Sequence, residues 1–363
     1  MGIITHQPKY MQVKDLIVEK YLQNASSKGS FLPPESELMK NFEVSRNTIR
    51  MALKNLREER VIITRQGQKS QINTVPPSSK HEMKNIAWVD LEYVGTDGVY
   101  FEIFKFINSL ADKREANVDY VNLQFKNASN DLLKSLKKYD GIIITGRIMK
   151  NKIPKEIFDC LSSMNNVVAI DNVSDLPTGN IIGTDNYTGA RMAVELLVRT
   201  NHKKVVFLGI AEAFHRYSPF AERLRGYKDM VAEQHLPQDN GLTVVSAEMN
   251  DTFDVRPVLE RTLKKHPDID AFFAITDFIA IQTLYALKGM DIKVPYDISV
   301  IGFDGLQLGE AVSPRLTTIC QPFAEIASLA LEHLLGVSAK TSKTFGFLPV
   351  APYLISRESV KNI

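Results

Sequence analysis

The chain has 363 residues, of which 44% are hydrophobic and 24% charged; this exceeds one core of ordinary size and excludes disordered, collagen-like and low-complexity proteins. It holds no apolar run of about 18 residues and no signal-peptide pattern at its start, so we expect neither a membrane span nor secretion. The net charge of +2 is uneven, because residues 1–74 carry 12 Lys and Arg against seven Asp and Glu. A basic head suits a polyanionic partner, although such an excess also occurs on ordinary surfaces.

Residues 1–74 form the first predicted domain, a small helical unit with a β-ribbon. Apolar spacing predicts helices over 10–22, 35–42 and 46–59 and short strands over 61–64 and 70–73. Residues 75–84 contain two prolines and two serines without any apolar period. This composition predicts an exposed, semi-stiff linker between two domains.

The second predicted domain, residues 85–363, alternates short apolar runs with amphipathic helical stretches. The runs are 86–89, 118–123, 141–144, 167–170, 204–208, 271–275 and 298–303, and the helical stretches are 100–114, 189–199, 221–233, 278–288 and 323–335. Such alternation is typical of an α/β fold with doubly wound parallel sheets and helices on both faces. The length of about 280 residues favours two lobes of this kind.

The helix predicted over 46–59 begins in a way that suits DNA contact. Ser45 is a suitable N-cap, so Arg46, Asn47 and Thr48 would lie in the first turn. In helix–turn–helix proteins such residues touch base edges in the major groove, where Arg binds guanine and Asn binds adenine. The ribbon that follows would add a basic wing. The alternative is a small interaction domain with a solvated, charged face.

Two stretches of the head resemble the GntR-type winged-helix domain. They are residues 31–38 (FLPPESEL) and 44–53 (VSRNTIRMAL), similar to the family patterns LPSE-x-x-L and VSR-x-x-VR-x-AL. Pro34 stands where the family usually has Ser, and Lys69 stands where its wing often has Gly. The resemblance implies double-stranded operator DNA as a partner, contacted by Glu35, Ser45, Arg46, Asn47, Thr48, Arg50, Arg65, Gln66, Gly67 and Lys69.

Polar residues recur where the predicted strands of the second domain end. They are Thr145 and Arg147, Asp171, Thr276 and Asp277, and Asp304. Ligands of doubly wound sheets bind beyond the carboxyl ends of the strands. Carboxylates and guanidinium groups suit sugar hydroxyls, and Tyr100 and Phe101 could stack on a sugar or base face. The alternative for any one Asp is that it caps the following helix.

The second domain resembles the LacI-type effector domain, which shares its fold with periplasmic sugar-binding proteins. The resemblance rests on 185–190 (DNYTGA), 223–227 (RLRGY), 294–304 (VPYDISVIGFD), 316–322 (LTTICQP) and 354–359 (LISRES). It implies that Arg223, Asp304 and Asp171 bind the effector, with Tyr100 and Phe101 as the family's aromatic pair. Thr276-Asp277 replaces the usual Asn-Asp, and Asn201-His202 replaces the usual Gly-His, where Asn can adopt the left-handed conformation.

Two other classes of protein fit this sequence less well than a regulator does. A sugar- or nucleotide-processing α/β enzyme is not favoured, because no GxGxxG follows a strand and residues 336–341 miss the P-loop spacing. A transport receptor would need a secretion signal. No CxxC, HExxH or clustered His and Cys pattern is found, and Cys160 and Cys320 suit a reducing cytoplasm. We therefore expect no catalytic residue, metal or cofactor.

The sequence thus predicts a cytoplasmic, homodimeric transcription factor with a DNA-binding head and a ligand-sensing body. The pairing of a GntR-type head with a LacI-type body is similar to the arabinose repressors of Bacillus-like bacteria. That resemblance implies a repressor of sugar-utilisation genes, released from operator DNA by a monosaccharide such as L-arabinose.

Overall fold

The computed structural model describes residues 9–17, 20–21, 32–58, 62–63, 71–72, 84–91, 98–123, 130–145, 153–164, 166–171, 178–210, 219–237, 244–247, 254–336 and 346–361. The chain divides into two compact units, Met1–Glu82 and Met83–Ile363. This division falls inside the predicted linker, residues 75–84, of which only Lys84 lies within the described residues. The two units are described separately below.

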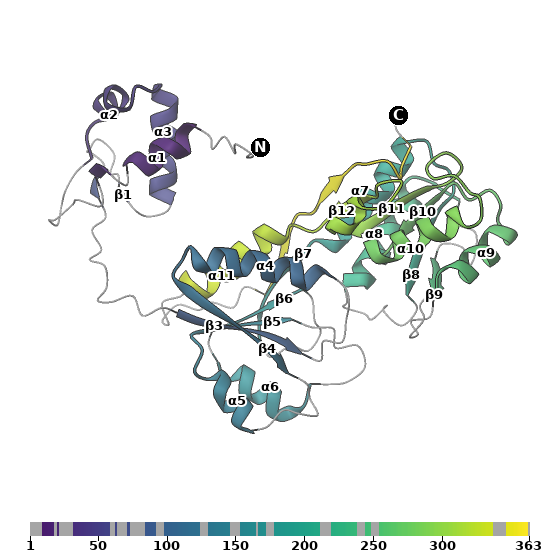
Figure 1. Cartoon of the computed structure of the whole chain (residues 1–363), viewed down its shortest axis with the longest axis horizontal. Helices are drawn as coiled ribbons and strands as arrows, with labels where there is room; N and C mark the ends of the chain where they lie inside the picture. The colour runs from purple at the N-terminus through teal and green to yellow at the C-terminus, as the bar shows by residue number, and fades with distance from the viewer. Residues whose placement is uncertain are drawn as a thin grey trace. The chain divides into compact units, whose positions relative to one another are not determined.

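Within its described residues, the first unit has three α-helices followed by a two-stranded ribbon (Figure 1). It consists of α1 (Lys9–Ile17), α2 (Glu35–Phe42), α3 (Arg46–Glu58), β1 (Ile62–Ile63) and β2 (Gln71–Ile72). The two short strands pair antiparallel. Helix α2 ends because Glu43 adopts the left-handed conformation and donates its N–H to the carbonyl of Met39. Apolar side chains from all three helices form one buried cluster: Val13, Ile17, Leu38, Ile49, Ala52, Leu53 and Leu56.

In the second unit, lobe 1 is an entirely parallel six-stranded sheet in the order β13-β7-β6-β5-β3-β4. Its strands are β3 (Lys84–Leu91), β4 (Ala116–Leu123), β5 (Gly141–Thr145), β6 (Val167–Ile170), β7 (Asn180–Thr184) and β13 (Gly346–Val350). One face is covered by α4 (Gly98–Asp112) and α11 (Phe323–Gly336), and the other by α5 (Asn130–Leu136) and α6 (Lys155–Ser162) (Figure 1). Burial from both faces explains the continuous apolar runs in the sequence.

Lobe 2 is a second six-stranded sheet, in the order β14-β12-β11-β10-β8-β9, with β14 antiparallel to β12 and the other pairs parallel. Its strands are β8 (Val205–Ile210), β9 (Val244–Ala247), β10 (Ala271–Ala274), β11 (Ser299–Asp304), β12 (Thr317–Cys320) and β14 (Tyr353–Ile355). Its helices are α7 (Asn186–Arg199), α8 (Pro219–Glu233), α9 (Arg256–Lys265), α10 (Asp277–Lys288) and the short 3-10 helix η4 (Gln307–Glu310).

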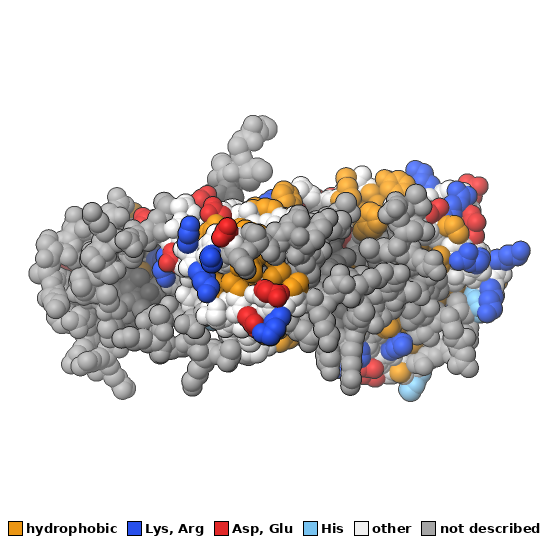
Figure 2. Space-filling view, turned by 90° about the horizontal axis from the view of Figure 1, so that it is seen from below, with side chains coloured by type: hydrophobic (Ala, Val, Ile, Leu, Met, Phe, Trp, Pro, Cys, Tyr) orange, Lys and Arg blue, Asp and Glu red, His pale blue; other side chains and the backbone are white. Residues whose placement is uncertain are grey.

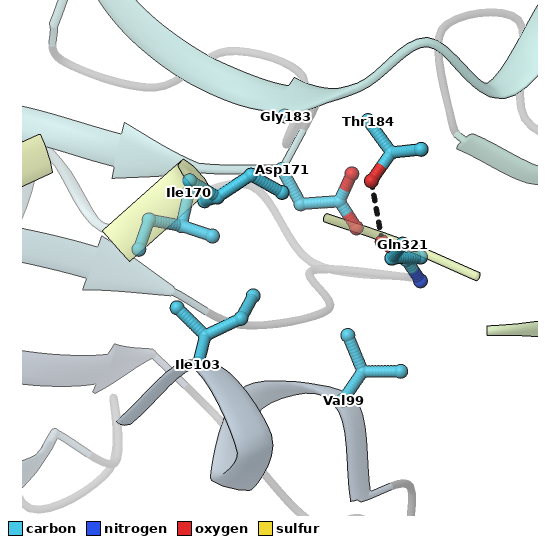
Figure 3. A pocket seen from close by; sticks show the side chains of 8 residues that line it. Val99, Ile103, Ile170, Asp171, Gly183, Thr184 and Gln321 are labelled. Atoms are coloured by element: carbon cyan, nitrogen blue, oxygen red, sulfur yellow. Dashed lines mark hydrogen bonds between the residues drawn. The ribbon is translucent and has the colours of Figure 1, made fainter. Parts of the chain in front are cut away.

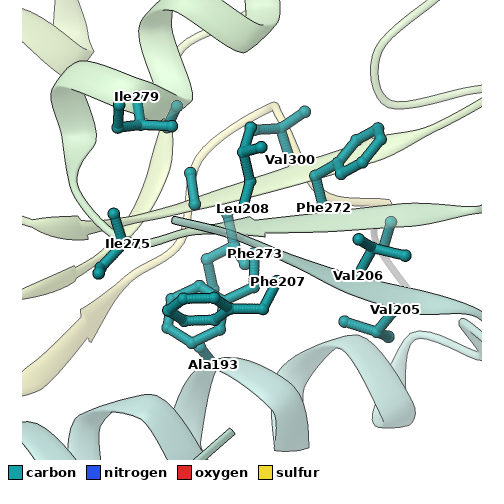
Figure 4. Packing of buried hydrophobic residues seen from close by; sticks show 14 of the residues in the cluster. Ala193, Val205, Val206, Phe207, Leu208, Phe272, Phe273, Ile275, Ile279 and Val300 are labelled. Carbon is teal, nitrogen blue, oxygen red and sulfur yellow. The ribbon is translucent and has the colours of Figure 1, made fainter. Parts of the chain in front are cut away.

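Aromatic packing holds α7 and α8 against the lobe 2 sheet. Phe207 and Phe273 lie edge to face, with ring centroids 5.1 Å apart, and Phe207 also contacts Tyr227. Figure 4 shows these strand residues above Ala193 of α7. The two helices approach closely because Gly226 has no side chain: a Cβ there would lie 2.3 Å from the carbonyl oxygen of Tyr187.

The chain passes between the lobes three times. Lobe 1 strand β7 leads into lobe 2 helix α7, lobe 2 strand β12 leads into lobe 1 helix α11, and lobe 1 strand β13 leads into lobe 2 strand β14. Each connection is only one or two residues long, at Asp185, at Gln321-Pro322 and at 351–352. Residues next to these crossings are therefore positioned to respond to both lobes.

A buried histidine closes the end of α7. Asn201 adopts the left-handed conformation expected for it, with φ of 65°. The next residue, His202, shares hydrogen bonds with the carbonyl of Leu197 and with the hydroxyl of Ser299 on β11, at 2.9 and 2.8 Å. Burial lowers the pKa of His202 below its usual 6.5.

This histidine predicts a loss of stability in acid. Its pKa is lower in the folded than in the unfolded chain, so the unfolded state binds more protons below pH 6.5 and the free energy of unfolding falls as pH drops. Thermal unfolding between pH 8 and pH 5 should show a smaller decline in His202→Asn than in the parent. The exposed His235 supplies the control, because His235→Asn should keep the full decline. Equal slopes in all three proteins would contradict this role.

Candidate functional site

The start of α3 presents two arginines on the face opposite its buried residues. The Ser45 hydroxyl accepts a hydrogen bond from the backbone N–H of Thr48 at 3.3 Å, as expected for an N-cap. Ile49 is buried, whereas the side chains of Arg46 and Arg50 are 67% and 60% exposed. Both arginines form ion pairs with the Glu35 carboxylate of α2. Three expected DNA contacts thus lie together on one surface.

The remaining expected DNA contacts fall in less completely described parts of the head. The backbone of Asn47 belongs to the first turn of α3. The wing residues Arg65, Gln66, Gly67 and Lys69 lie outside the described residues. The described strands flank them, with Ile63 opposite Gln71.

In the second unit, the central feature is a buried ion pair in lobe 2. Arg223 on α8 and Asp304 at the end of β11 are joined by a contact of 3.1 Å, and each side chain is only 3% exposed. Asp304 has a positive φ of 135°. The Arg223 guanidinium also stacks on the ring of Phe303 at 3.7 Å from its centroid and donates to the carbonyl of Ile275 at 2.6 Å. These contacts compensate the free-energy cost of burying the positive charge of Arg223.

Hydrogen bonds continue from this pair into lobe 1. Gln321 donates its amide N–H to the Asp304 carboxylate at 2.8 Å and accepts the hydroxyl of Thr184 at 2.7 Å. Arg223 donates to the side-chain oxygen of Asn186 at 2.8 Å, and the side-chain nitrogen of Asn186 donates to the backbone carbonyl of Thr184 at 2.9 Å. Five residues therefore form a closed circuit, here called the hinge circuit: Arg223, Asp304, Gln321, Thr184 and Asn186. It includes Gln321 of one crossing between the lobes and the two residues that flank Asp185 at another.

A small pocket adjoins the hinge circuit on the lobe 1 side. Its lining consists of Val99, Ile103, Ile170, Asp171, Gly183, Thr184, Gln321 and Ile326. Asp171 follows β6 directly and has a positive φ of 67°. Figure 3 shows its carboxylate turned to the same side as the hydrogen bond between Thr184 and Gln321. Acidic, hydroxyl and amide groups of Asp171, Thr184 and Gln321 thus border an otherwise apolar pocket.

The sequence predicts that Asp277 binds the ligand, but in the structure other groups of the protein already bond its carboxylate. The carboxylate accepts the N–H groups of Gly305 and Leu306 at 2.9 and 2.7 Å and the hydroxyl of Thr318 at 2.5 Å. Burial, and then the negative charge of Asp304, raise the pKa of Asp277. Asp277 therefore holds the turn after β11, next to the ion pair. Thr276 has a capping role, since its hydroxyl accepts the N–H of Ile279.

The other expected effector residues differ in how they are used. Thr145 is buried and donates its hydroxyl to Asp90, which also accepts the indole N–H of Trp88. Tyr100 packs in the core of lobe 1, whereas Phe101 is 63% exposed beside Lys105. Arg147 lies outside the described residues.

Sequence reasoning assigned no role to Asp90, Thr184, Asn186 or Gln321. The only signal for the last two was their position in the stretches DNYTGA and LTTICQP, which gave the resemblance but no function. Their partners come from distant parts of the chain: Gln321 bonds residues 137 and 17 positions away. Only the tertiary fold brings such groups together.

The described residues show few features of other kinds of site. Within them, no group of three or more His, Cys, Asp or Glu side chains could hold a metal ion. No described helix is both long and apolar enough to cross a membrane. On the face in Figure 2, the described acidic and basic side chains are interspersed, without a large area of one sign.

Parts of both units match known families. Residues 9–72 match the bacterial regulatory proteins of the gntR family, and residues 194–360 match a periplasmic binding protein-like domain. The chain joins a gntR-family winged helix to a periplasmic-binding-protein-like domain. The expected fold class is thereby confirmed. The chain has the domains of a DNA-binding regulator, which confirms the expectation that it is not an enzyme.

The relatives differ in how much of this chain they align with. The arabinose metabolism transcriptional repressor of Geobacillus stearothermophilus is 24% identical over an alignment of 375 positions that covers 98% of each chain. The ribose operon repressor of Halalkalibacterium halodurans is 28% identical over 63% of this chain and 65% of its own. The chain spans about half the length of two other relatives, the ribose operon repressor of Haemophilus influenzae and the transcriptional regulator MalR of Clostridium butyricum. Among solved structures, a CelR–cellobiose complex has a TM-score of 0.61 at 20% identity, over 87% of this chain and 92% of its own.

The ion pair predicts a large stability difference between two nearby arginines of α8. Arg223→Met should leave the Asp304 charge buried without its partner and lower the free energy of unfolding by about 3–5 kcal/mol. Arg225→Met removes an exposed pair with Glu222 and should cost about 1 kcal/mol or less. Urea unfolding of both variants tests the difference.

A second substitution separates charge from packing in this experiment. Asp304→Asn in the Arg223→Met background removes the unpaired carboxylate and should restore part of the lost stability. If Arg223→Met cost no more than Arg225→Met, the ion pair would not have the structural importance assigned to it.

Proposed function

We propose that the protein is a ligand-responsive transcriptional regulator that represses genes of sugar utilisation. The observation that carries the proposal is the presence in one chain of a gntR-family head and a periplasmic-binding-protein-like body. Asp171, Thr184 and Gln321 border a small apolar pocket at the hinge of that body. A regulator of this kind binds operator DNA with its head and a small molecule with its body. It acts inside the cell, where the DNA is.

The DNA-binding half of the proposal uses the first turn of α3. Arg46 and Arg50 are exposed one turn apart on a helix that is held to the head by Ile49, Leu53 and Leu56. Such a helix can enter the major groove, where guanidinium groups bind guanine. Asn47 and Thr48 share this turn, and the wing residues Arg65, Gln66, Gly67 and Lys69 would contact the backbone or the minor groove.

A single head reads only a short half-site, so tight binding requires two heads. We propose a homodimer joined through the second unit. Support comes from large apolar side chains exposed on lobe 2: Phe278 and Tyr285 lie seven residues apart on α10, and Leu308 lies on η4. Residues seven apart share one helix face, and aromatic residues are enriched in interfaces.

The effector in this proposal is a monosaccharide, and L-arabinose is the first candidate because the relative matched over 98% of both chains is an arabinose metabolism repressor. Asp171 and Gln321 line the pocket, Asp304 lies one hydrogen bond beyond Gln321, and Arg223 pairs in turn with Asp304. Carboxylates, amides and guanidinium groups together can satisfy sugar hydroxyls, each of which both donates and accepts.

The proposed switch is competition within the hinge circuit. A sugar hydroxyl that bonds Gln321 or Asp304 must replace or extend hydrogen bonds that now run between the lobes. It would therefore favour one arrangement of the lobes over another, which is the only way in which a ligand can shift a conformational equilibrium. In the arrangement favoured by the sugar, the spacing between the two heads would no longer fit the operator.

Asp171 provides the most direct test of the effector site. Asn tolerates a positive φ, so Asp171→Asn should keep the backbone and remove only the charge. Loss of charged hydrogen bonds should weaken L-arabinose binding by about 1.5–3 kcal/mol, or roughly 10- to 100-fold, in titration calorimetry. If a monosaccharide screen by thermal shift identifies a better sugar, that sugar replaces arabinose in the experiment.

The control is Asp131→Asn, which makes the same charge change on α5 at a side chain that is 96% exposed. It should bind the sugar as the parent does. Equal sugar affinity in Asp171→Asn and the parent would contradict the site. Absence of binding by any monosaccharide in the parent would contradict the sensing function itself.

A further inference from the structure

One carboxylate in the head lies between both exposed arginines of the proposed recognition helix. The Glu35 Oε2 atom is 3.4 Å from the Nε of Arg46 and 3.5 Å from the Nε of Arg50. Glu35 is the first residue of α2, and its side chain is only 33% exposed, against 67% and 60% for the arginines. The first turn of α3 contains no acidic residue of its own, so this negative charge is supplied by the preceding helix.

We infer that Glu35 is a positioning residue for base recognition, which sets the orientation of Arg46 and Arg50 before DNA binds. The inference rests on the proposed DNA-binding function of the head. It concerns specificity rather than stability, because exposed ion pairs of this kind contribute little to the free energy of folding.

The geometry supports orientation for two physical reasons. Arg46 and Arg50 are one turn apart, where like charges repel, and a carboxylate between them allows both side chains to lie parallel. The nearest contact of each arginine to Glu35 is made by Nε, so the two Nη groups at the end of each guanidinium are farther from the carboxylate. That end is a planar fork that can bind guanine O6 and N7 together.

Glu35 should also disfavour contacts between these two arginines and DNA phosphates. A phosphate that approached the Nε edge of either arginine would meet the carboxylate and be repelled. Non-specific binding depends almost entirely on phosphate contacts, whereas operator binding also uses base edges. Glu35 therefore lowers affinity for random DNA more than affinity for the operator, and so increases the ratio between them.

The test compares Glu35→Gln with Glu37→Gln in the full-length protein. Both residues are acidic and lie in the first turn of α2, so each variant loses the same charge next to the same helix end. Gln is nearly as good a helix former as Glu, and thermal unfolding will confirm that both variants fold. The probes are a duplex selected by the parent protein from a random pool and a shuffled duplex of equal length.

Glu35→Gln should bind the shuffled duplex more tightly than the parent does, with a steeper salt dependence, and lose about tenfold in the ratio of selected to shuffled affinity. Glu37→Gln should keep the parent ratio. In the double variant with Arg46→Ala and Arg50→Ala, Glu35→Gln should no longer change the ratio, because Glu35 acts through those side chains.

The outcomes that overturn the role of Glu35 differ from the outcome that overturns DNA binding by the head. If the parent prefers the selected duplex and both Gln variants keep its ratio, the role of Glu35 is overturned while DNA binding by the head stands. The same holds if Glu35→Gln weakens both duplexes equally, since that is the result of damage to the fold. If the parent itself does not distinguish any selected duplex from the shuffled one, the DNA-binding function proposed for the head fails.

Discussion

The buried contact between Arg223 and Asp304 constrains the whole second unit. Neither charge can remain in the interior of lobe 2 without the other, so α8 and the end of β11 are held at a fixed separation. Arg223 also donates to Asn186 and to the carbonyl of Ile275, and Asp304 also accepts the amide N–H of Gln321. Two of these partners adjoin connections between the lobes. A pair that stabilises one lobe therefore also determines what the hinge can bond to.

This arrangement explains why a small molecule at the hinge could change the relation between the lobes. Gln321 links two sides of the hinge circuit. Its amide donates an N–H to Asp304 and accepts the hydroxyl of Thr184 with its carbonyl oxygen. A hydroxylated ligand offers the same donor and acceptor groups as the protein does. It can replace one side of the circuit at small energetic cost, whereas an apolar ligand would leave buried polar groups unsatisfied.

Much of the fold could be predicted from the sequence because it depends on local periodicity. Alternating apolar runs and helical stretches indicated the parallel sheets, Ser45 indicated the start of α3, and Asn201 indicated the end of α7. The site was harder to predict. Asp304 and Arg223 were recognised separately, but the sequence could not show that they bind each other, nor that Asp277 is occupied by the N–H groups of Gly305 and Leu306. Such pairings depend on the turn after β11 and on helix packing, which leave no periodic signal.

The central claim is that sugar and operator act on one conformational equilibrium through the hinge. Calorimetry of sugar binding to the full-length protein, with and without a saturating duplex selected by the parent, tests it most directly. Coupling between two sites is reciprocal, so the operator should weaken sugar binding by the same factor by which sugar weakens operator binding. Identical sugar affinity with and without the duplex would contradict the account, because the body would then sense a ligand without informing the head.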